Sequence, residues 1–421
     1  MSELSYLEKL LDGAEVEWVA LNKLATFLKG KSLPKEKITP DGNRYCIHYG
    51  ELFTHYGPII DKVCSKTNQA INESILSEKN DVLMPTSDVT PRGLATASCI
   101  QESGVILGGD ILIIRCSGVD GRYLSNFIIN NKKKILQMVK GSTVYHLYAK
   151  DIGKLLIPIP CPNNPEKSLA IQSEIVRILD KFTALTAELT AELTAELTAR
   201  KKQYNYYRDR LLSFDEGEVE WKALGEVGHI VTGRTPKSSD KSAWGDDVDF
   251  VTPSDIKNGM RNITCPSRRL SAEGAASMPK VRIPRGSLLV TCIGADMGKT
   301  VINANDCIPN QQINAITLSD DSVQVGYLFH ILTAMRETLR RQGELGGGTM
   351  PLINKSDFSK IVVPIPSHEE QNRIAKILDK FDTLTNSITE GLPREIELRQ
   401  KQYEYYRDLL FSFPKPETVS N

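Results

Sequence analysis

The stretch of this sequence that comes closest to a chemical motif is Gly294–Thr300, which reads Gly-Ala-Asp-Met-Gly-Lys-Thr. It resembles the glycine-rich loop that cradles the phosphates of a nucleotide with its backbone amides. Only three residues separate its two glycines, whereas the phosphate cradle needs four. We therefore predict a β-turn that carries a surface lysine, Lys299, and no nucleotide binding.

Histidine and cysteine, which also carry chemistry in many proteins, are dispersed along the chain. The histidines have neither the spacing of metal ligands nor that of a catalytic triad. They are His48, His55, His146, His229, His330 and His368. The eight cysteines include no Cys-x-x-Cys pair, so we expect reduced thiols in packed positions. Dinucleotide, zinc-protease and nucleophile-elbow motifs are missing as well, which predicts a binding protein without catalytic or metal-ligating residues.

The composition is that of ordinary globular material. The chain has 421 residues, enough for two or three domains, and 40% of them are hydrophobic. It has no apolar run of about 18 residues and no basic, apolar leader, so we expect a cytoplasmic protein without membrane contact. Because 52 basic residues balance 52 acidic ones, any site for a polyanion must be local.

A four-residue unit, Leu-Thr-Ala-Glu, is written three times in tandem within residues 185–197. Ala, Glu and Leu favour helix, and no Gly or Pro interrupts residues 170–214, so we predict one long helix. Each unit adds about 6 Å of length and about 40° of net rotation. The stripe of Leu185, Leu189, Leu193 and Leu197 needs an apolar partner, which disfavours the alternative of a solvated low-complexity tract.

Segments on both sides of the tandem recur near the C-terminus. Residues 172–182 return as 371–381 and residues 200–214 return as 399–413, both 199 positions later and without a gap. The tandem is thus matched by a degenerate copy with its own apolar stripe, formed by Leu384, Ile388, Leu392 and Ile396. Gly391 and Pro393 cost about 1 and 3 kcal/mol inside a regular helix, so we predict a kink or break there.

Three glutamates of the tandem, Glu188, Glu192 and Glu196, stand one above another on the predicted helix. Such a series costs about 0.2 to 0.5 kcal/mol per neighbouring pair. Arg394 and Arg399 are the predicted cations of the facing helix that offset it.

The duplication extends outward from the helices. Glu-Val-Glu-Trp occurs at 15–18 and again 203 positions later at 218–221, and Pro-Ile-Pro occurs at 158–160 and again at 364–366. Between these anchors the two halves diverge. We therefore predict two domains on one plan with different surfaces.

The divergent regions have the patterns of strands with interspersed helices. Residues 108–115 and 281–293 read as turns followed by strands. Residues 123–138 and 327–341 are predicted to form one amphipathic helix each, the second ending in the basic residues Arg340 and Arg341.

These features together resemble the specificity subunits of type I restriction-modification enzymes. The resemblance rests on the two divergent domains, on the repeated Pro-Ile-Pro and Ile-Leu-Asp-Lys-Phe segments, and above all on the tandem. Residues 231–236, 244–245 and 251–256 look like the opening of a target-recognition domain of that family. Residues 49–52 and 81–84 match it more loosely in the first half.

The resemblance implies an α+β protein with an internal pseudo-twofold duplication. Two β-rich target-recognition domains would be separated by two long antiparallel helices that form a coiled coil. The predicted parts are an N-terminal conserved segment (1–21), recognition domain 1 (22–155), a central long helix (156–214), a connector (215–224), recognition domain 2 (225–361) and a C-terminal long helix (362–421).

The function that the resemblance implies is recognition of double-stranded DNA. Each domain would read one half of a bipartite target while the helices set the spacer between the halves. Catalysis would belong to partners: two modification subunits that methylate adenine with S-adenosylmethionine, and restriction subunits that use ATP and Mg²⁺. This chain itself would bind no cofactor and no metal.

Candidate DNA-binding residues are basic or polar side chains in loop-like segments, where they can hold phosphates or read base edges. For each of them a solvated surface charge or a packed aromatic ring is the alternative. They are Lys29, Lys31, Lys35, Arg44, His55 and Tyr56 in the first domain, and Arg234, Lys237, Lys241, Arg268, Arg269 and Lys299 in the second.

Tyrosines and arginines gather at equivalent ends of the two long helices. Interleaved rings and cations can bind nucleic acid, but packing or contact with a modification subunit is the simpler interpretation. These residues are Tyr204, Tyr206, Tyr207, Arg208, Tyr403, Tyr405, Tyr406 and Arg407.

Two alternatives to DNA recognition come from other classes of protein. A non-catalytic coiled-coil scaffold whose divergent domains bind proteins or carbohydrates is mildly favoured by the neutral charge. A complete single-chain restriction enzyme or methyltransferase is disfavoured, because neither divergent domain contains a catalytic or cofactor motif.

Overall fold

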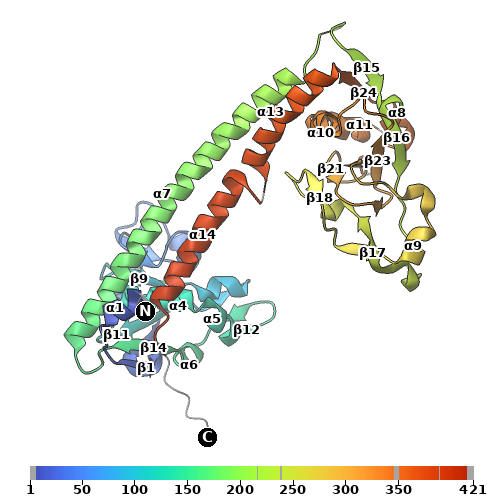
Figure 1. Ribbon diagram of the computed structural model, residues 1–421. Coiled ribbons are helices and arrows are strands. Elements are labelled where there is room, and N and C mark those ends of the chain that lie inside the picture. Colours follow the sequence, from blue (N-terminus) through green and yellow to red (C-terminus); the bar gives the residue numbers. More distant parts are fainter. Residues whose placement is uncertain (1–5, 216, 238, 346–349, 388, 415–421) are drawn as a thin grey trace. The chain divides into compact units, whose positions relative to one another are not determined.

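The computed structural model describes residues 6–215, 217–237, 239–345, 350–387 and 389–414 (Figure 1). The chain divides into two compact units. Unit 1 contains the chain up to Glu188 together with the chain from Gln400 onward, and unit 2 contains Leu189–Arg399. Unit 1 is therefore built from two separate stretches of sequence.

The central layer of unit 1 is a five-stranded sheet, here called main sheet 1, in the order β2-β11-β7-β9-β4. Its strands are β2 (Ala25–Lys29), β11 (Ile111–Cys116), β7 (Val82–Pro85), β9 (Ser98–Ile100) and β4 (Ile59–Ile60). Neighbouring strands are antiparallel except for β4 and β9, which are parallel.

Smaller strands surround main sheet 1. Outer sheet 1 has the order β5-β3-β10-β6, formed by β5 (Ser65–Thr67), β3 (Arg44–Ile47), β10 (Ile106–Leu107) and β6 (Ile75–Leu76). A three-stranded sheet joins β12 (Lys140–Gly141), β13 (Tyr145–His146) and β8 (Ser87–Asp88), and β1 (Val16–Ala20) pairs with β14 (Leu156–Pro160). The short helices are α1 (Tyr6–Leu11), α2 (Leu21–Leu24), α3 (Glu51–Thr54), α4 (Gly121–Asn130), α5 (Lys132–Met138) and α6 (Ala149–Ile152).

Unit 2 repeats this plan. Main sheet 2 has the order β16-β23-β20-β21-β18, formed by β16 (Gly228–Thr232), β23 (Ile313–Leu318), β20 (Leu288–Thr291), β21 (Thr300–Asn303) and β18 (Asn262–Ile263). Outer sheet 2 has the order β19-β17-β22, formed by β19 (Arg268–Leu270), β17 (Trp244–Val251) and β22 (Cys307–Pro309), and β15 (Glu220–Ala223) pairs with β24 (Val362–Ile365). Its short helices are α8 (Leu224–Val227), α9 (Ala272–Ala276), α10 (Val325–Ala334), α11 (Arg336–Glu344) and α12 (Lys355–Ser359).

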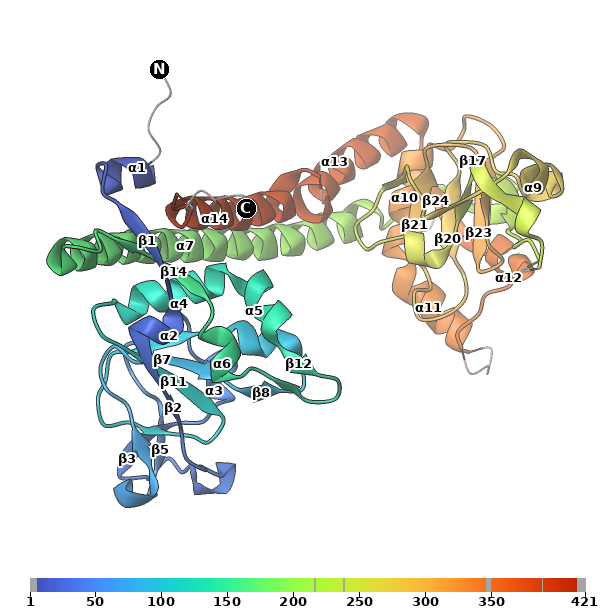
Figure 2. The same cartoon turned by 90° about the horizontal axis from the view of Figure 1, so that it is seen from below.

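Each main sheet is buried on both faces, which explains its runs of apolar residues. In β11, Leu112 and Ile114 belong to one cluster with the apolar residues of α4. Ile111 and Ile113, which point to the opposite face, pack against outer sheet 1. The layers of unit 1 are therefore long helix, α4, main sheet and outer sheet, an order that Figure 2 shows.

The long helices are α7 (Pro165–Leu211), α13 (His368–Asn386) and α14 (Gly391–Leu410). The predicted uninterrupted helix across the tandem is confirmed by α7, and the predicted break in the second copy is confirmed by the end of α13 at Asn386. Gly391 has φ +76, and a Cβ there would lie 2.4 Å from the carbonyl oxygen of Thr383. Pro393 stands in the first turn of α14, where its missing N–H is not needed. Ile388 lies outside the described residues.

The long helices pair within each unit through equivalent contacts. In unit 1 the ring of Phe182 stacks on Tyr406, with centroids 5.4 Å apart, and Thr183 Oγ1 lies 3.1 Å from the hydroxyl of Tyr403. In unit 2 Tyr207 stacks on Phe381 at 5.7 Å. Phe182 and Phe381 are 199 positions apart, as are Tyr207 and Tyr406. The two units therefore use one helix–helix contact twice, and the predicted α+β fold with an internal duplication is confirmed.

The prediction of single helices over 123–138 and 327–341 was wrong. Each region forms two helices, α4 and α5 in unit 1 and α10 and α11 in unit 2. Asn131 leaves the helical conformation (φ −92, ψ 23), and its side chain donates to the carbonyl of Phe127 at 2.9 Å. Met335 also leaves the helical conformation (φ −78, ψ 1), and its backbone N–H donates to the carbonyl of Ile331 at 2.9 Å. A side chain or backbone N–H that caps a carbonyl ends the first helix, and the hydrophobic period continues across the break.

Candidate nucleic-acid interface

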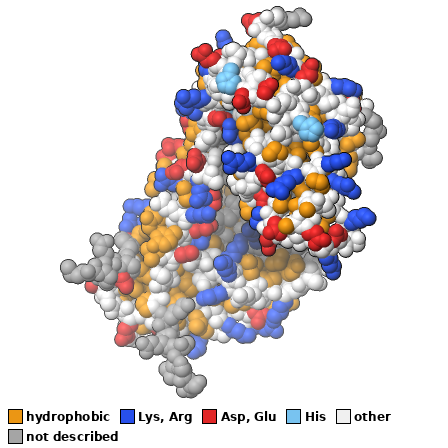
Figure 3. All heavy atoms as spheres, turned by 45° about the vertical axis from the view of Figure 1, so that its right-hand side comes forward, with side chains coloured by type: hydrophobic (Ala, Val, Ile, Leu, Met, Phe, Trp, Pro, Cys, Tyr) orange, Lys and Arg blue, Asp and Glu red, His pale blue; other side chains and the backbone are white. Residues whose placement is uncertain are grey.

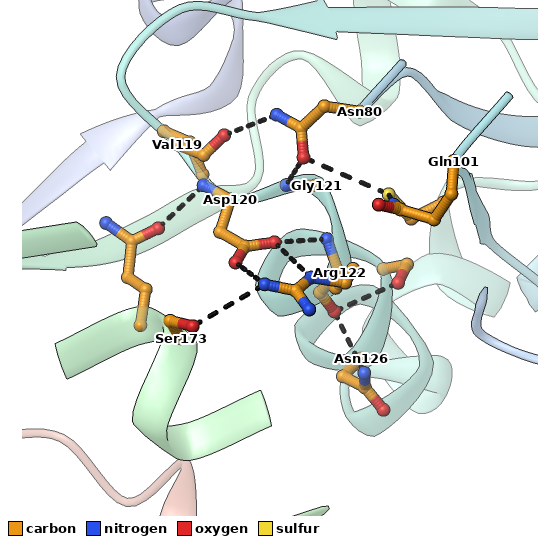
Figure 4. A network of polar contacts seen from close by, with 11 residues as sticks. Asn80, Gln101, Val119, Asp120, Gly121, Arg122, Asn126 and Ser173 are labelled. Carbon is orange, nitrogen blue, oxygen red and sulfur yellow. Dashed lines mark hydrogen bonds and ion pairs between the residues drawn. The ribbon is translucent and has the colours of Figure 1, made fainter. Parts of the chain in front are cut away.

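Recognition domain 1 is fixed to α7 by a buried polar network (Figure 4). The backbone N–H of Asp120 donates to Oε1 of Gln172 at 2.9 Å, and the Gln172 side chain is fully buried. Arg122 forms an ion pair with Asp120 at 2.8 Å and reaches Ser173 Oγ at 3.5 Å. Tyr123, also buried, donates to the carbonyl of Pro158 at 2.8 Å. Because buried polar groups are costly to unpair, this network sets the position of α4 on α7.

Recognition domain 2 carries the same anchors on α13. The N–H of Gln324 donates to Oε1 of Gln371 at 2.8 Å, and the hydroxyl of Tyr327 donates to Pro364 at 2.9 Å. Gln172 and Gln371 are equivalent residues of the 199-residue repeat. The duplicated segments therefore keep the side chains that attach each domain to its helix.

Unit 2 adds an ionic network for which unit 1 has no counterpart among its described residues. Arg261 forms a two-pronged ion pair with Asp379, both N–O distances being 3.0 Å. The fully buried His330 places Nε2 2.7 Å from the same carboxylate. Burial alone would raise the pKa of Asp379, but the hydrogen bonds and charges of His330 and Arg261 outweigh it and hold the pKa below its usual range. The network ties β18 and α10 to α13.

We expect Asp379→Asn to lower the free energy of unfolding of unit 2 by about 1–2 kcal/mol at pH 7, because it leaves Arg261 without its charged partner. The carboxylate stabilises the fold above its unfolded pKa, near 4, and this contribution is lost as the pH falls through the lower folded pKa. In urea unfolding, the difference in free energy of unfolding between Asp379→Asn and wild type should therefore be smaller at pH 3 than at pH 7.

The matched control is Asp180→Asn, at the equivalent position of the first repeat. Burial raises the pKa of Asp180, with smaller contributions from Asp61 and Asp120, and this outweighs the lowering by Arg122, so the charge of Asp180 does not stabilise the fold. We expect a change within about 0.5 kcal/mol. Equal effects of the two substitutions would contradict the role given to the Asp379 network.

The candidate residues of domain 1 are spread over several elements. Lys35 and His55 line one cavity of about 780 Å³ with His48, Tyr49 and Phe53. Lys29 lies at the end of β2, 3.8 Å from Asp110, and Lys31 and Arg44 are exposed. Tyr56 is half-buried and accepts a hydrogen bond from the N–H of Cys64 at 3.1 Å. Burial raises its pKa to about 12, so the structure gives Tyr56 a packing position.

The candidate residues of domain 2 differ in whether their side chains are exposed to solvent or contact other residues of the domain. Arg234, Lys237 and Lys241 are exposed on the segment between β16 and β17. Arg269 forms an ion pair with Asp249 at 2.9 Å. Arg268 lies over the ring of Trp244, with its guanidinium carbon 3.4 Å from the ring centroid.

The prediction that Lys299 is a surface lysine was wrong. Its side chain is 12% exposed, and Nζ donates to the carbonyl of Ile256 at 3.1 Å and pairs with Asp296 at 2.7 Å. The predicted turn is present between β20 and β21, and its amides are used within the loop: Met297 N–H bonds to Gly294 and Gly298 N–H bonds to Thr291. Two amides of the loop are therefore already bonded within the chain.

A polar cavity of about 430 Å³ lies in unit 2 between α7, the residues 257–260 and the loop at 298–300. Its lining is rich in basic side chains, including Lys201, Arg208, Lys257 and Arg336. On the face shown in Figure 3, basic side chains alternate with acidic and hydrophobic ones. The lining of this cavity is therefore one local basic region of the kind expected for a chain of neutral net charge.

Two contacts between a cation and an aromatic ring in the outer sheets were not found by sequence reasoning, although Arg268 itself was a candidate residue. Lys66 of β5 lies over the exposed ring of Tyr45 on β3, 5.5 Å from its centroid. Trp244, which the sequence placed only within a family motif, holds Arg268. Alternation of exposed and buried residues is hard to detect in strands of three or four residues, and only the pairing of distant strands brings these side chains together.

The helix-end tyrosines divide into packed and exposed sets. Tyr204 belongs to the core of unit 2, and Tyr207 and Tyr406 stack on phenylalanines. Tyr206 and Tyr405, the equivalent residues of the repeat, are 58% and 64% exposed. Arg208 lies over Tyr204 at 5.7 Å and Arg407 over Tyr403 at 5.9 Å. The most exposed ring of each copy is therefore Tyr206 or Tyr405, while the stacked rings of Tyr207 and Tyr406 remain partly accessible, at 39% and 36%.

Ion pairs within α7 and within α14 involve one glutamate of the tandem and both arginines that the sequence suggested as its partners. Arg394 pairs with Glu397 and Arg399 pairs with Glu395, both glutamates of α14 itself. Glu196 pairs with Arg200 of α7 at 2.7 Å. Neighbours on the same helix supply these ion pairs because residues three or four apart already face each other.

The chain matches, over residues 14–199 and 216–398, the family described as the type I restriction modification DNA specificity domain. It is 39% identical to the type I restriction enzyme EcoR124I/EcoR124II specificity subunit of Escherichia coli, over 100% of both chains. The chain belongs to this specificity family. It is also 36% identical to the EcoprrI specificity subunit of Escherichia coli over 93% of both chains.

Solved structures of the specificity family share the fold. The HsdS subunit from Thermoanaerobacter tengcongensis aligns with a TM-score of 0.55 and 17% identity over 94% of this chain and 95% of that chain. A chain from a structure of the type I R-M system aligns with a TM-score of 0.63 and 18% identity over 94% and 97%. Nothing in these comparisons favours the alternative of a protein- or carbohydrate-binding scaffold.

The two family matches cover one repeat each, which agrees with the anchors described above. Within the described residues, no cluster of three or more His, Cys, Asp or Glu side chains could hold a metal ion. In the same part of the chain, no helix combines the length and the hydropathy that crossing a membrane requires.

Proposed function

We propose that this chain is the non-catalytic, DNA-reading subunit of a type I restriction-modification complex, in which each recognition domain reads one half of a two-part target. The observation that carries this proposal is that the two units share one fold but carry different side chains on their outer sheets. The main sheets and the helix anchors are alike in both units, whereas the outer sheets carry different side chains. Different side chains on equivalent frames are what two different half-sites require.

The long helices would set the spacer between the half-sites. One base pair advances DNA by about 3.4 Å and rotates it by about 35°. One tetrad adds a similar rotation and about 6 Å of rise, which leaves a surplus of length for DNA bending or domain tilt. The three copies in this chain would correspond to the longer spacer of a pair of related targets.

Catalysis and cofactors would lie on partner subunits. Two modification subunits would bring S-adenosylmethionine to the target adenines, and restriction subunits would use ATP and Mg²⁺. Membership of the specificity family supports this division of work. The exposed candidate residues would hold DNA phosphates and position the base-reading side chains. They include Lys31 and Arg44 in domain 1 and Arg234, Lys237 and Lys241 in domain 2.

The test is to produce the chain with its modification subunit and to map every methylated adenine in a genome by sequencing. We expect one motif with two specified halves and a spacer of fixed length without sequence preference. Methylation at a single undivided motif, or without sequence preference, would contradict the proposal.

Replacing Tyr206 or Tyr405 by Ala is expected to weaken assembly with the modification subunits at least tenfold, because exposed tyrosines are frequent anchors of protein interfaces. Analytical ultracentrifugation measures assembly, and a DNA fragment in a separate titration measures DNA affinity. Tyr148→Ala, which removes another exposed ring of unit 1, is the control and should leave assembly unchanged. Normal assembly with lost DNA affinity would overturn this assignment.

A further inference from the structure

The two outer sheets occupy equivalent places in the two units. In unit 1, β10 pairs in parallel with β3, and Leu107 precedes the first residue of β11 by four positions. In unit 2, β22 pairs in parallel with β17, and Pro309 precedes the first residue of β23 by the same four positions. Because Leu107 pairs with Ile47 and Pro309 with Val251, each position of β3 has a counterpart on β17.

The same register aligns the edge strands β5 and β19. Cys46 pairs with Ser65, and its counterpart Phe250 pairs with Arg268. Ser65 in domain 1 is therefore replaced by Arg268 in domain 2. Ser65 is half-buried and its hydroxyl donates to Glu51, whereas Arg268 is exposed. The shared main sheets cannot distinguish two half-sites, but residues that differ at an equivalent place can.

The side chain of Arg268 is held flat on an aromatic platform. Its guanidinium carbon lies 3.4 Å from the centroid of Trp244 and 5.9 Å from that of Phe250. The two rings meet edge to face at 5.1 Å, and Phe250 is buried in the cluster beneath outer sheet 2. Stacking of this kind fixes the guanidinium plane while it leaves the N–H groups at the edge available.

Arg268 is exposed, and its N–H groups donate to no acceptor within the described part of the chain. The neighbouring Arg269 differs, since it donates to Asp249 at 2.9 Å and to the carbonyl of Asp247 at 3.3 Å. Arg269 of β19 is thus bonded within the domain. Arg268 presents a planar group of N–H donors whose orientation is set by the stacking on Trp244.

We propose that Arg268 is a base-reading residue of domain 2 and that it recognises a guanine in the major groove through O6 and N7. A planar fork of N–H donors matches these two acceptors, and the Arg–guanine pair is the commonest specific contact between proteins and DNA. Stacking on Trp244 lowers the conformational entropy that the side chain loses on binding. This inference rests on the proposed function and adds one residue and one base to it. Trp244 is the positioning residue.

The experiment is to map methylated adenines with the complex of modification subunit and either wild-type chain or Arg268→Ala. Wild type should give a motif whose two halves include a guanine in the half read by domain 2. In Arg268→Ala the preference for that G·C pair should fall roughly 10- to 100-fold, while the other half stays unchanged. The unchanged half also shows that the variant is folded and assembled.

Two further variants sharpen this result. Arg268→Lys keeps the charge but not the fork, so affinity should fall less than in Arg268→Ala while the preference for guanine is still reduced. Arg282→Ala is the control, because Arg282 is an exposed arginine of the same domain that pairs with Asp306 at 3.3 Å. The control should keep the full motif.

The role of Trp244 is tested by Trp244→Phe and Trp244→Ala. A phenyl ring can still support the guanidinium, so Trp244→Phe should keep the guanine preference, whereas Trp244→Ala should lose part of it. A packing role alone would lower thermal stability in both variants without changing the sequence preference.

An unchanged motif in Arg268→Ala would overturn the inference and leave the proposed function intact. Uniformly weaker methylation of the same motif would also overturn it, because that outcome describes a phosphate contact. A wild-type complex without a two-part motif would instead contradict the proposed function itself.

Discussion

Deleting one tetrad, Thr194–Leu197, is expected to shorten the spacer of the DNA target by one base pair and to reduce methylation of the original target roughly 1,000-fold. The deletion shortens α7 by about 6 Å and removes about 40° of net rotation between its ends. With the old spacer only one domain can then reach its half-site. Each lost base-pair contact costs about 1–3 kcal/mol, so the loss of several contacts gives an effect of this size.

We expect the chain to fold after such a deletion, because the tandem repeats with period four. Leu189 and Leu193 are half-buried in α7, and the removal of one complete unit leaves the same residue types on the same stripe. The measurement is the methylated motif of the complex, compared at the old and the new spacer length. The double substitution Thr194→Ala and Glu196→Ala, which keeps the length of the helix, is the control and should keep the spacer. An unchanged spacer after the deletion would refute the role of the tandem.

Phe411→Ala is expected to lower the free energy of unfolding of unit 1 by about 3–5 kcal/mol. Phe411 is 6% exposed, and its ring lies 5.7 Å from that of Tyr123 and 5.6 Å from that of Phe127. The next residues hold the same segment in place, since Trp18 Nε1 donates to the carbonyl of Pro414 at 2.6 Å. The C-terminal segment therefore completes a core that begins near the N-terminus.

Denaturant unfolding can be followed for unit 1 alone in a chain that carries Trp221→Phe and Trp244→Phe, because Trp18 is then the remaining tryptophan. Ser412→Ala is the control, since Ser412 is exposed and bonds only to the carbonyl of Leu409 among the described residues. Its effect should stay within about 0.5 kcal/mol. If Phe411→Ala shifts the unfolding of unit 1 no more than Ser412→Ala, the C-terminal segment does not close this core.

The sequence by itself determined the features that depend on neighbours along the chain. The continuous α7 follows from helix-favouring residues without Gly or Pro, and the break before Gly391 follows from the cost of Gly and Pro in a helix. The repeat of 199 residues predicted that Gln172 and Gln371 are equivalent before their matching hydrogen bonds were known. It also carried the resemblance to the specificity family.

Only the tertiary structure decided which side chains meet across long separations in sequence. The breaks at Asn131 and Met335 are a separate case, because they depend on bonds to carbonyls a few residues earlier, which the hydrophobic period does not reveal. Lys299 reads as a loop residue, yet Ile256, some 40 residues earlier, binds its ammonium group. Arg268 and Arg269 look alike as neighbours in the sequence, but strand pairing points one at Trp244 and the other at Asp249. Propensity acts over a few residues, whereas burial and strand register are set by the whole domain, and they decide which basic side chains are left to bind DNA.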